Sequence, residues 1–244
     1  MTQHFVVAPE AIQGDAVVFS VAQAHQMTRV LRQTDGAEVI VLDGQGAQYR
    51  VHLSIAGKYV AGTVRGGAEA CYEPARRVSL LVAPPKGDRW EWLLQKGTEL
   101  GVACFQPIVT RYAQPGAAVV KPRHHEIVRE AVEQCRRLKL PEIAPPRPLA
   151  DALREAVQTP DHAVVMLWEG DHAGQGVLPL SALLDGEMGD AGRHIVLIVG
   201  PEGGFHDEET ALARDLGVAL ASLGPLILRT ETAALAAAAL VLCR

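Results

Sequence analysis

The first quarter of the chain alternates short apolar runs with glycine-containing turns. Between Ala16 and Arg65, the β-branched runs AVVFSV, AEVIVLDG, QYRVHLSI and KYVAGTV are separated by turns such as Asp35-Gly36 and Asp43-Gly44. Short runs of this kind, divided by such turns, predict closely spaced antiparallel strands. We therefore expect a small β-barrel in this part of the chain.

One helix interrupts the predicted strands. Ser20 is a preferred N-cap residue, because its hydroxyl can accept a hydrogen bond from a backbone N–H of the first turn. The apolar residues that follow are spaced to fall on one helical face: Val21, Ala24, Met27, Val30 and Leu31. Arg29 and Arg32 then lie near the end of this helix, where positive charge favours the helix dipole.

A linker is predicted after these strands. The stretch from Arg65 to Pro74 has few large apolar residues and is rich in turn formers. A chain of 244 residues has room for two modest domains. We therefore predict a first domain over residues 1–72 and a second domain over residues 73–244.

In the second part of the chain, the predicted strands alternate with helices and the elements are longer. Val78–Ala83 is an apolar run, Arg89–Leu100 has helical spacing, and Ala103–Val109 is apolar again. Gly101 is typical of a helix end. The alternation predicts an α/β domain with a parallel sheet. Further predicted elements are a helix over His125–Leu138, strands over Ala163–Leu167 and His194–Val199, a helix over Asp207–Leu216 and a strand over Val218–Leu223.

Charge is distributed unevenly along the chain. The formal net charge is −5, but residues 76–147 carry 13 Lys or Arg against 7 Asp or Glu, which makes this segment +6 and the remainder −11. A solvated basic face explains such a segment, and so does a surface that binds the phosphates of a nucleic acid. The distribution keeps a nucleic-acid partner open in spite of the acidic total.

Cysteine spacing and hydropathy exclude several classes of protein. The four cysteines form no Cys-x-x-Cys pair, which predicts reduced thiols and neither a zinc cage nor disulfides: Cys71, Cys104, Cys135 and Cys243. His124-His125 has no third metal ligand at a useful spacing. The longest apolar run, Ala233–Cys243, is too short to span a bilayer, and the N-terminus has no signal-peptide pattern. We expect a soluble cytoplasmic protein without a metal.

Two segments place candidate chemistry at the edge of the predicted sheet. In IVLIVGPEGGF (Ile195–Phe205), an apolar strand runs into a glycine-rich turn and then a helix, which leaves backbone N–H groups free at a sheet edge. In LGPLILRTETAALAAAAL (Leu223–Leu240), a Gly-Pro turn leads to Arg229 and to a helix capped by Thr230 or Thr232. The alternative explanations are a tight structural turn for the first segment and ordinary helix capping for the second.

These two segments, together with PKGDRWEWLLQKGTELGV (Pro85–Val102) and EQCRRLKLPEI (Glu133–Ile143), resemble the RsmE family of 16S ribosomal RNA uridine N3-methyltransferases. The resemblance covers nearly the whole chain and is looser in VLDGQGAQYRVHL, which is similar to the family's PUA-like barrel. It implies a SPOUT-type catalytic domain of the α/β class, a C-terminal trefoil knot, a homodimer, and S-adenosylmethionine as the cofactor. Chain-topology rules treat knots as rare exceptions, so the knot follows from the resemblance alone.

The resemblance also assigns residues to the cofactor. Three loops are implied to enclose S-adenosylmethionine, and their residues are Glu169, Gly200, Pro201, Gly203, Gly204, Leu223, Gly224, Leu228 and Thr230. Glycines in such loops let the backbone approach a ligand closely. Leu226 departs from the family pattern, in which an Arg is more frequent at this position.

The implied reaction moves a methyl group from the cofactor to N3 of a uracil in 16S rRNA or the small ribosomal subunit. That nitrogen carries a proton at neutral pH, so the proton must be removed or the anion stabilised. We expect Arg229 to stabilise charge on the uracil oxygens, and Glu202 or Glu231 to accept the proton. Stabilisation of a helix N-terminus is the alternative role for both acids. The residues expected to contact RNA are Arg29, Arg32, Lys86, Arg89, Arg136 and Arg137.

Two other classes of protein stay open at this point. A Rossmann-type nucleotide-binding enzyme would explain the sheet and the glycine-rich turn, although the chain has no GxGxxG fingerprint. A non-catalytic RNA-binding protein would explain the basic segment, but it would not explain the GPEGG and LRTET motifs. Binding of S-adenosylmethionine separates the enzyme from the second class.

Overall fold

The structure is a computed structural model that describes residues 2–67, 73–114, 116, 118–169, 176–186, 188–189 and 192–244. The chain divides into two compact units. The first unit contains Met1–Glu73 and Arg129–Leu140, and the second contains Pro74–Val128 and Pro141–Arg244. Most of the predicted linker, including the boundary at residue 72, lies outside the described residues.

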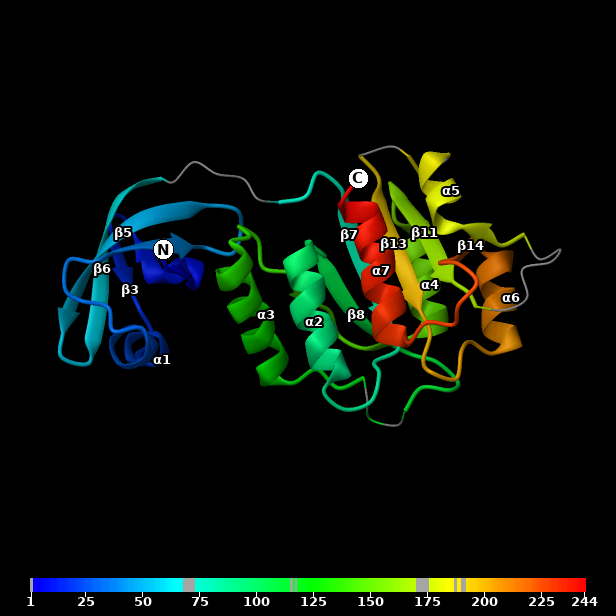
Figure 1. The fold of residues 1–244 in the computed structure, drawn as a ribbon, viewed down its shortest axis with the longest axis horizontal. Helices are drawn as coiled ribbons and strands as arrows, with labels where there is room; N and C mark the ends of the chain where they lie inside the picture. The colour runs from blue at the N-terminus through cyan, green and yellow to red at the C-terminus, as the bar shows by residue number, and fades with distance from the viewer. Residues whose placement is uncertain are drawn as a thin grey trace. The chain divides into compact units, whose positions relative to one another are not determined.

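The first unit is built on a six-stranded sheet with the order β1-β4-β5-β6-β3-β2. Figure 1 labels its strands β3, β5 and β6. Its strands are β1 (His4–Val6), β2 (Ile12–Gln13), β3 (Ala16–Val18), β4 (Glu38–Leu42), β5 (Gln48–Ala56) and β6 (Tyr59–Gly67), with a 3-10 turn, η1 (Pro9–Ala11), before β2. The predicted antiparallel pairing is confirmed for all neighbours except β1 and β4, which are parallel. The order is open, so closure into a barrel stays a prediction. Arg65–Gly67 belong to β6 and not to a linker, which corrects the predicted start of that linker.

The predicted helix of the first unit is only partly correct. Ser20 caps α1 (Val21–His25) as expected, in a reciprocal pair of hydrogen bonds with Gln23. The chain then continues as a π-helical turn, η2 (Gln26–Val30). A π turn holds more residues than an α turn, so the 3.6-residue spacing used for the prediction does not hold across it. Met27 is buried in the core as expected, whereas Val21 and Val30 are exposed.

Helix α3 (Pro122–Cys135) starts in the second unit and ends in the first. In the first unit, the backbone N–H of Val6 donates to Glu133 at 3.0 Å, and Arg129 donates to the same carboxylate at 2.6 Å. The helix ends before the predicted Leu138, because Arg136 takes a left-handed conformation with φ of 65°.

A single carboxylate holds the segment after α3. Glu73 accepts hydrogen bonds from the Arg137 guanidinium at 2.9 Å and from the backbone N–H groups of Leu138 and Lys139 at 2.9 Å. Burial alone would raise the pKa of Glu73, but the Arg137 and backbone hydrogen bonds hold it below its ordinary value. Glu73 therefore fixes residues 137–139 within the first unit.

The second unit contains a parallel sheet, as predicted, and its order among the described residues is β10-β8-β7-β13-β11-β14-β12, with β9 also paired to β8. Its strands are β7 (Arg77–Val82), β8 (Cys104–Val109), β9 (Glu142–Ile143), β10 (Arg147–Pro148), β11 (His162–Leu167), β12 (Leu178–Pro179), β13 (His194–Val199) and β14 (Ala219–Ser222). The predicted core strands agree with β7, β8, β11, β13 and β14 to within one residue at each end. β9, β10 and β12, of two residues each, were not predicted.

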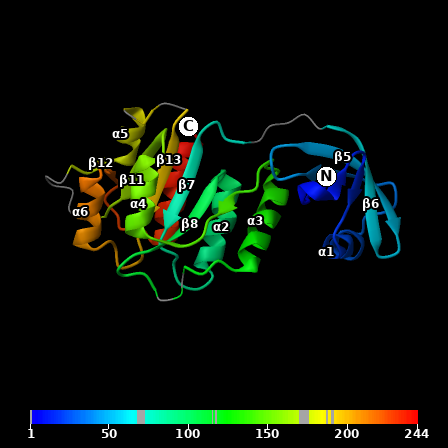
Figure 2. The same ribbon diagram turned by 180° about the vertical axis from the view of Figure 1, so that it is seen from behind.

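Helices cover both faces of this sheet (Figures 1 and 2). They are α2 (Arg89–Leu100), α4 (Leu149–Gln158), α5 (Leu180–Asp185), α6 (Asp207–Asp215) and α7 (Thr230–Leu242). Alternate strand residues enter two separate cores: Leu197 packs in the cluster that contains α2 and α7 residues, and Ile198 in the one that contains α4 and α6 residues. The predicted α2 is confirmed, with Gly101 at its end in a left-handed conformation, while α4 and α5 were not predicted.

The sheet does not follow chain order. β13 lies between β7 and β11, and pairs with β7 over six residues, from His194 opposite Arg77 to Val199 opposite Val82. After β14, the chain returns as α7 to pack on β7, β13 and α2. This path brings the ends of β11, β13 and β14 together at one edge. Within the described residues, no helix is long and apolar enough to cross a membrane.

Candidate active site

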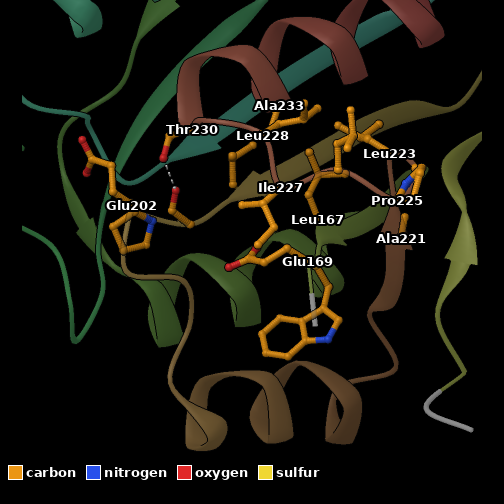
Figure 3. A pocket seen from close by; sticks show the side chains of 16 residues that line it. Leu167, Glu169, Glu202, Ala221, Leu223, Pro225, Ile227, Leu228, Thr230 and Ala233 are labelled. Carbon is orange, nitrogen blue, oxygen red and sulfur yellow. Dashed lines mark hydrogen bonds between the residues drawn. The ribbon is translucent and has the colours of Figure 1, made fainter. Parts of the chain in front are cut away.

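A pocket lies at the carboxyl ends of β11, β13 and β14, where the last loop leads into α7 (Figure 3). Ligands of open parallel sheets bind at this kind of edge. The described lining residues are Leu167, Trp168, Glu169, Val199, Gly200, Pro201, Glu202, Ala221, Leu223, Gly224, Pro225, Leu226, Ile227, Leu228, Thr230 and Ala233. Seven of the nine predicted cofactor residues are among them. Gly203 and Gly204 are not.

A hydrogen bond joins two of the pocket loops. The hydroxyl of Thr230 donates to the backbone carbonyl of Gly200 at 2.9 Å (Figure 3). Thr230 is buried at the first position of α7. The expectation that Thr230 or Thr232 caps this helix is therefore wrong, because Arg229 occupies the N-cap position and the Thr230 hydroxyl bonds to the other loop. The threonine positions the loops instead.

The two glycines outside the lining differ from each other. Gly204 has φ of +72°, and a Cβ added there would lie 2.7 Å from Oε1 of Glu169. A side chain at Gly204 would therefore be strained and would displace Glu169 from its place in the pocket wall. Gly203 is exposed, and a Cβ on it would meet Tyr112 at 3.3 Å. Of the two glycines, Gly204 is the one with a steric link to the pocket.

The described lining is acidic and apolar. Glu169 and Glu202 are its charged residues, and it contains no Lys, Arg or His among the residues that the structure describes. Leu226 and Ile227 are 77% and 81% exposed, although both are large apolar side chains. Such a wall suits a ligand with positive charge and an apolar body, and it does not suit a pyrophosphate.

Arg89 lies beside the pocket and contacts two acids. Its guanidinium is 3.3 Å from Oε1 of Glu202 and 4.0 Å from Oε1 of Glu231. Glu202 is a lining residue, while Glu231 is buried in the first turn of α7. The predicted proton acceptor Glu202 is thus held by an ion pair in this structure.

Arg229 is exposed just outside the pocket. It precedes Thr230 and is not itself a lining residue. Within the described part of the chain, its guanidinium forms no ion pair with an acid. Its charge is therefore available to a substrate that approaches the mouth of the pocket.

The predicted RNA-contacting residues fall into two groups. Arg29, Arg32 and Lys86 are exposed, and Arg136 is half-buried. Arg137 is buried in the ion pair with Glu73, so its expected role in phosphate binding is wrong: its guanidinium is already used inside the first unit. The sequence did not reveal this because the two residues lie far apart along the chain.

Several lining residues were missed from the sequence. Leu167 and Trp168 precede Glu169 at the end of β11, and Pro225 and Ile227 fill the loop between Gly224 and Leu228. Each lies within two residues of a predicted residue, so treating each motif as a continuous loop would have included them. Ala221 and Ala233 have no comparable signal, because small residues are common in any α/β core.

A second polar cluster lies at the opposite, amino edge of the sheet. The Ser79 hydroxyl is 2.8 Å from Nε2 of His194, whose ring packs edge-on against His162 with centroids 4.5 Å apart. Burial, with His162 and Arg77 nearby, lowers the pKa of His194 to about 4. Burial also raises the pKa of the Cys104 thiol, beside Ser79, to about 11. These groups are neutral at pH 7.

Comparisons with known proteins identify a family and several relatives of this chain. Residues 72–242 match the RNA methyltransferase domain family. The chain is 34% identical to the ribosomal RNA small subunit methyltransferase E of Synechocystis sp., over 96% of this chain and 75% of the relative. It is 28% identical to the Bacillus subtilis protein of the same name, over 96% of this chain and 93% of the relative.

The fold agrees with solved structures over nearly its whole length. A crystal structure of the ribosomal RNA small subunit methyltransferase E from Neisseria gonorrhoeae, bound to S-adenosyl methionine, superposes with a TM-score of 0.84 at 27% identity, covering 98% of this chain and 96% of the other. The fold is therefore that of an RNA methyltransferase domain. Within that class, the chain belongs to the ribosomal RNA small subunit methyltransferase E family.

Proposed function

We propose that this protein transfers a methyl group from S-adenosylmethionine to N3 of a uridine in the 16S rRNA of the small ribosomal subunit, in the cytoplasm. The observation that carries the proposal is the pocket at the carboxyl edge of the sheet, in a chain whose relatives are named small-subunit rRNA methyltransferases. The choice of uridine N3 rests on the motifs at Ile195–Phe205 and Leu223–Leu240.

The described residues of the pocket fit this cofactor. S-adenosylmethionine carries a sulfonium and an ammonium group, which the carboxylates of Glu169 and Glu202 can stabilise. Its adenine is flat and apolar on both faces, and Leu223, Ile227 and Leu228 offer apolar surface near backbone groups that can bond its edge. The relative from Neisseria gonorrhoeae was solved with the same cofactor. When bound, the cofactor supplies the methyl group.

The residues of this chain have to handle charge on the uracil. Loss of the N3 proton puts negative charge on the two flanking oxygens, and the exposed guanidinium of Arg229 can donate to one of them while N3 stays open to the methyl group. Glu202 is the proposed proton acceptor at the pocket wall. Arg89 and the backbone N–H of Lys86 contact Oε1 of Glu202, so Oε2 is the oxygen proposed to take the proton.

RNA contact is proposed for basic residues of each unit that are exposed or half-buried. These are Arg29, Arg32 and Arg136 in the first unit and Lys86 in the second. Arg137 is left out because Glu73 neutralises it, and Arg89 is left out because it contacts Glu202 and Glu231. We propose residues 1–72 as a PUA-like RNA-binding domain and residues 73–244 as a SPOUT-type methyltransferase domain.

Two further features of the architecture belong to the proposal. A trefoil knot in the C-terminal part is supported by the position of β13 between β7 and β11, and by the return of α7 onto β7 and β13 after the pocket loops. A homodimer is supported by large apolar side chains that stay exposed on the second unit, namely Trp92, Leu226, Ile227 and Leu240. Analytical ultracentrifugation over a series of protein concentrations tests the dimer, because it measures the molar mass in solution.

Calorimetric titration with S-adenosylmethionine tests the cofactor assignment. We expect saturable binding at one site per chain, weakened by Glu169→Gln, and no binding of NAD by the same pocket. A protein that binds rRNA but no S-adenosylmethionine would instead be a non-catalytic RNA-binding protein. Binding of NAD alone would support a Rossmann-type enzyme, although the described lining contains no basic group to receive a pyrophosphate.

A further inference from the structure

Three segments of the second unit meet at Arg89. This residue starts α2, Glu202 follows β13, and Glu231 lies in the first turn of α7. The Arg89 side chain is 39% exposed, that of Glu202 is 32% exposed, and that of Glu231 is 9% exposed. One guanidinium thus lies between a carboxylate at the pocket wall and a carboxylate in the protein interior.

The carboxylate of Glu231 is buried and depends on Arg89 for a nearby positive charge. Its Oε2 atom is buried and has no hydrogen-bond partner, and Arg89 is the one basic side chain within 4.0 Å of its carboxylate among the described residues. A buried carboxylate is costly unless a positive group stands near it. The preceding residue, Thr230, binds the carbonyl of Gly200. The first turn of α7 is therefore joined to the loop after β13 twice, directly through Thr230 and indirectly through Arg89.

We propose that Arg89 is a positioning residue for the cofactor pocket, and that it holds the loop at Gly200–Glu202 and the first turn of α7 in register by pairing with Glu202 and Glu231. This role rests on the proposed function, because it presumes that the pocket binds S-adenosylmethionine. It replaces the expectation that Arg89 binds an RNA phosphate. Removing the guanidinium releases Glu202 and leaves Glu231 without compensation, so both loops lose a shared anchor.

Binding measurements on purified full-length protein test this role. Arg89→Ala should weaken S-adenosylmethionine binding in calorimetry by about tenfold, corresponding to about 1.4 kcal/mol. Arg89→Lys should restore part of the affinity, because it keeps the positive charge, but its shorter side chain cannot place that charge where Nη1 of Arg89 contacts both carboxylates. The loss of affinity in the double variant Arg89→Ala with Glu202→Gln should be smaller than the sum of the losses in the two single variants, since each single change already breaks the shared ion pair.

A matched control separates positioning from a general loss of charge. Arg123 pairs with Glu91 at 3.2 Å in the same unit, with side chains 67% and 31% exposed, and neither residue contacts the two pocket loops through a described ion pair. Arg123→Ala should leave the affinity unchanged. If Arg89→Ala unfolds the domain, Arg89→Ala with Glu231→Gln removes the buried charge and should restore the melting temperature while leaving cofactor binding weak.

The salt dependence of 16S rRNA binding discriminates between the two roles of Arg89. Positioning predicts an unchanged slope of log affinity against log salt for Arg89→Ala, whereas a phosphate contact flattens the slope by about 0.7 to 0.9. Wild-type cofactor affinity in Arg89→Ala, with or without a flatter slope, would overturn the inference and leave the proposed function intact. Failure of the unaltered protein to bind S-adenosylmethionine would overturn the proposed function and this inference together.

Discussion

The two edges of the parallel sheet carry polar groups in contrasting ways. At the amino edge, Ser79, His162 and His194 pack against one another, and burial keeps the histidines neutral by lowering the pKa of each. At the carboxyl edge, Glu169 and Glu202 line an open pocket beside the exposed apolar loop 223–228. Polar side chains therefore contact one another at the first edge, whereas at the second they face space that a ligand can fill.

The contrast shows why a polar cluster alone does not define a functional site. Ser79 and His194 have the residue types of a nucleophile and its base, at 2.8 Å, but Ser79 is buried, so no substrate can reach it. The carboxyl edge has no such pair. Its chemistry depends instead on backbone geometry and on a bound cofactor. Access, more than residue type, separates the two edges.

Gly204→Val should have the largest effect. The side chain would be strained at φ of +72° and would displace Glu169, so we expect S-adenosylmethionine affinity to fall by about 100-fold or more in calorimetry. Gly217→Val is the matched control, because Gly217 has φ of +74° but nothing within 4 Å of an added Cβ. Equal losses in both variants would show that backbone strain, and not the pocket, explains the effect.

Arg229→Ala should lower the rate without lowering cofactor affinity. If the guanidinium stabilises charge on the uracil, methyl transfer should fall by about 100-fold, a barrier increase of about 2.7 kcal/mol. Arg229→Lys should recover only part of that rate. A parallel fall in S-adenosylmethionine affinity would mean that Arg229 merely supports the loop, and would remove it from the catalytic residues.

The amino edge should affect stability alone. The folded-state pKa of His194 is lowered from about 6.5 to about 4, so its stabilising contribution is fully present above pH 6.5 and is lost as pH falls toward 4. His194→Asn should reduce the slope of the unfolding free energy against pH in this window. The reduction should correspond to up to about one proton fewer taken up on unfolding. Chemical denaturation at several pH values measures it. A change in cofactor affinity at pH 7.5 would contradict the separation of the two edges.

The smallest effect is expected from the first unit. Arg29→Ala with Arg32→Ala should reduce the slope of log rRNA affinity against log salt by up to about 1.5, with cofactor affinity unchanged. Both residues are exposed in the described structure. An unaltered slope would show that Arg29 and Arg32 do not contact RNA phosphates. Their role would then be to stabilise the end of the helical segment.

The sequence predicted the second unit better than the first. Buried parallel strands are continuous apolar runs with clear limits, so His194–Val199 was predicted without error. The glycine-rich turn follows directly on such a strand, so its sequence also predicted the edge of the sheet at which the pocket lies. The order of the strands was not predictable, because no local pattern tells β13 to pair with β7.

Errors arose where a distant partner decided the outcome. Arg137 belongs to a basic segment, but Glu73 binds it and buries it. For Arg89, predicted to contact RNA, the sequence showed no sign of its acidic neighbours Glu202 and Glu231, which are more than 100 residues away in the chain. Val30 was placed on a buried face because a π turn has no reliable sequence signal.

Methyl transfer into rRNA tests the central claim most directly. The purified protein is incubated with methyl-labelled S-adenosylmethionine and small ribosomal subunits or 16S rRNA from a strain that lacks this gene, and the rRNA is then digested to nucleosides for mass spectrometry. The account predicts one labelled nucleoside, N3-methyluridine, at a single position, and about 100-fold less of it with Arg229→Ala. Label on another atom or nucleoside, or no label in a protein that binds the cofactor, would contradict it.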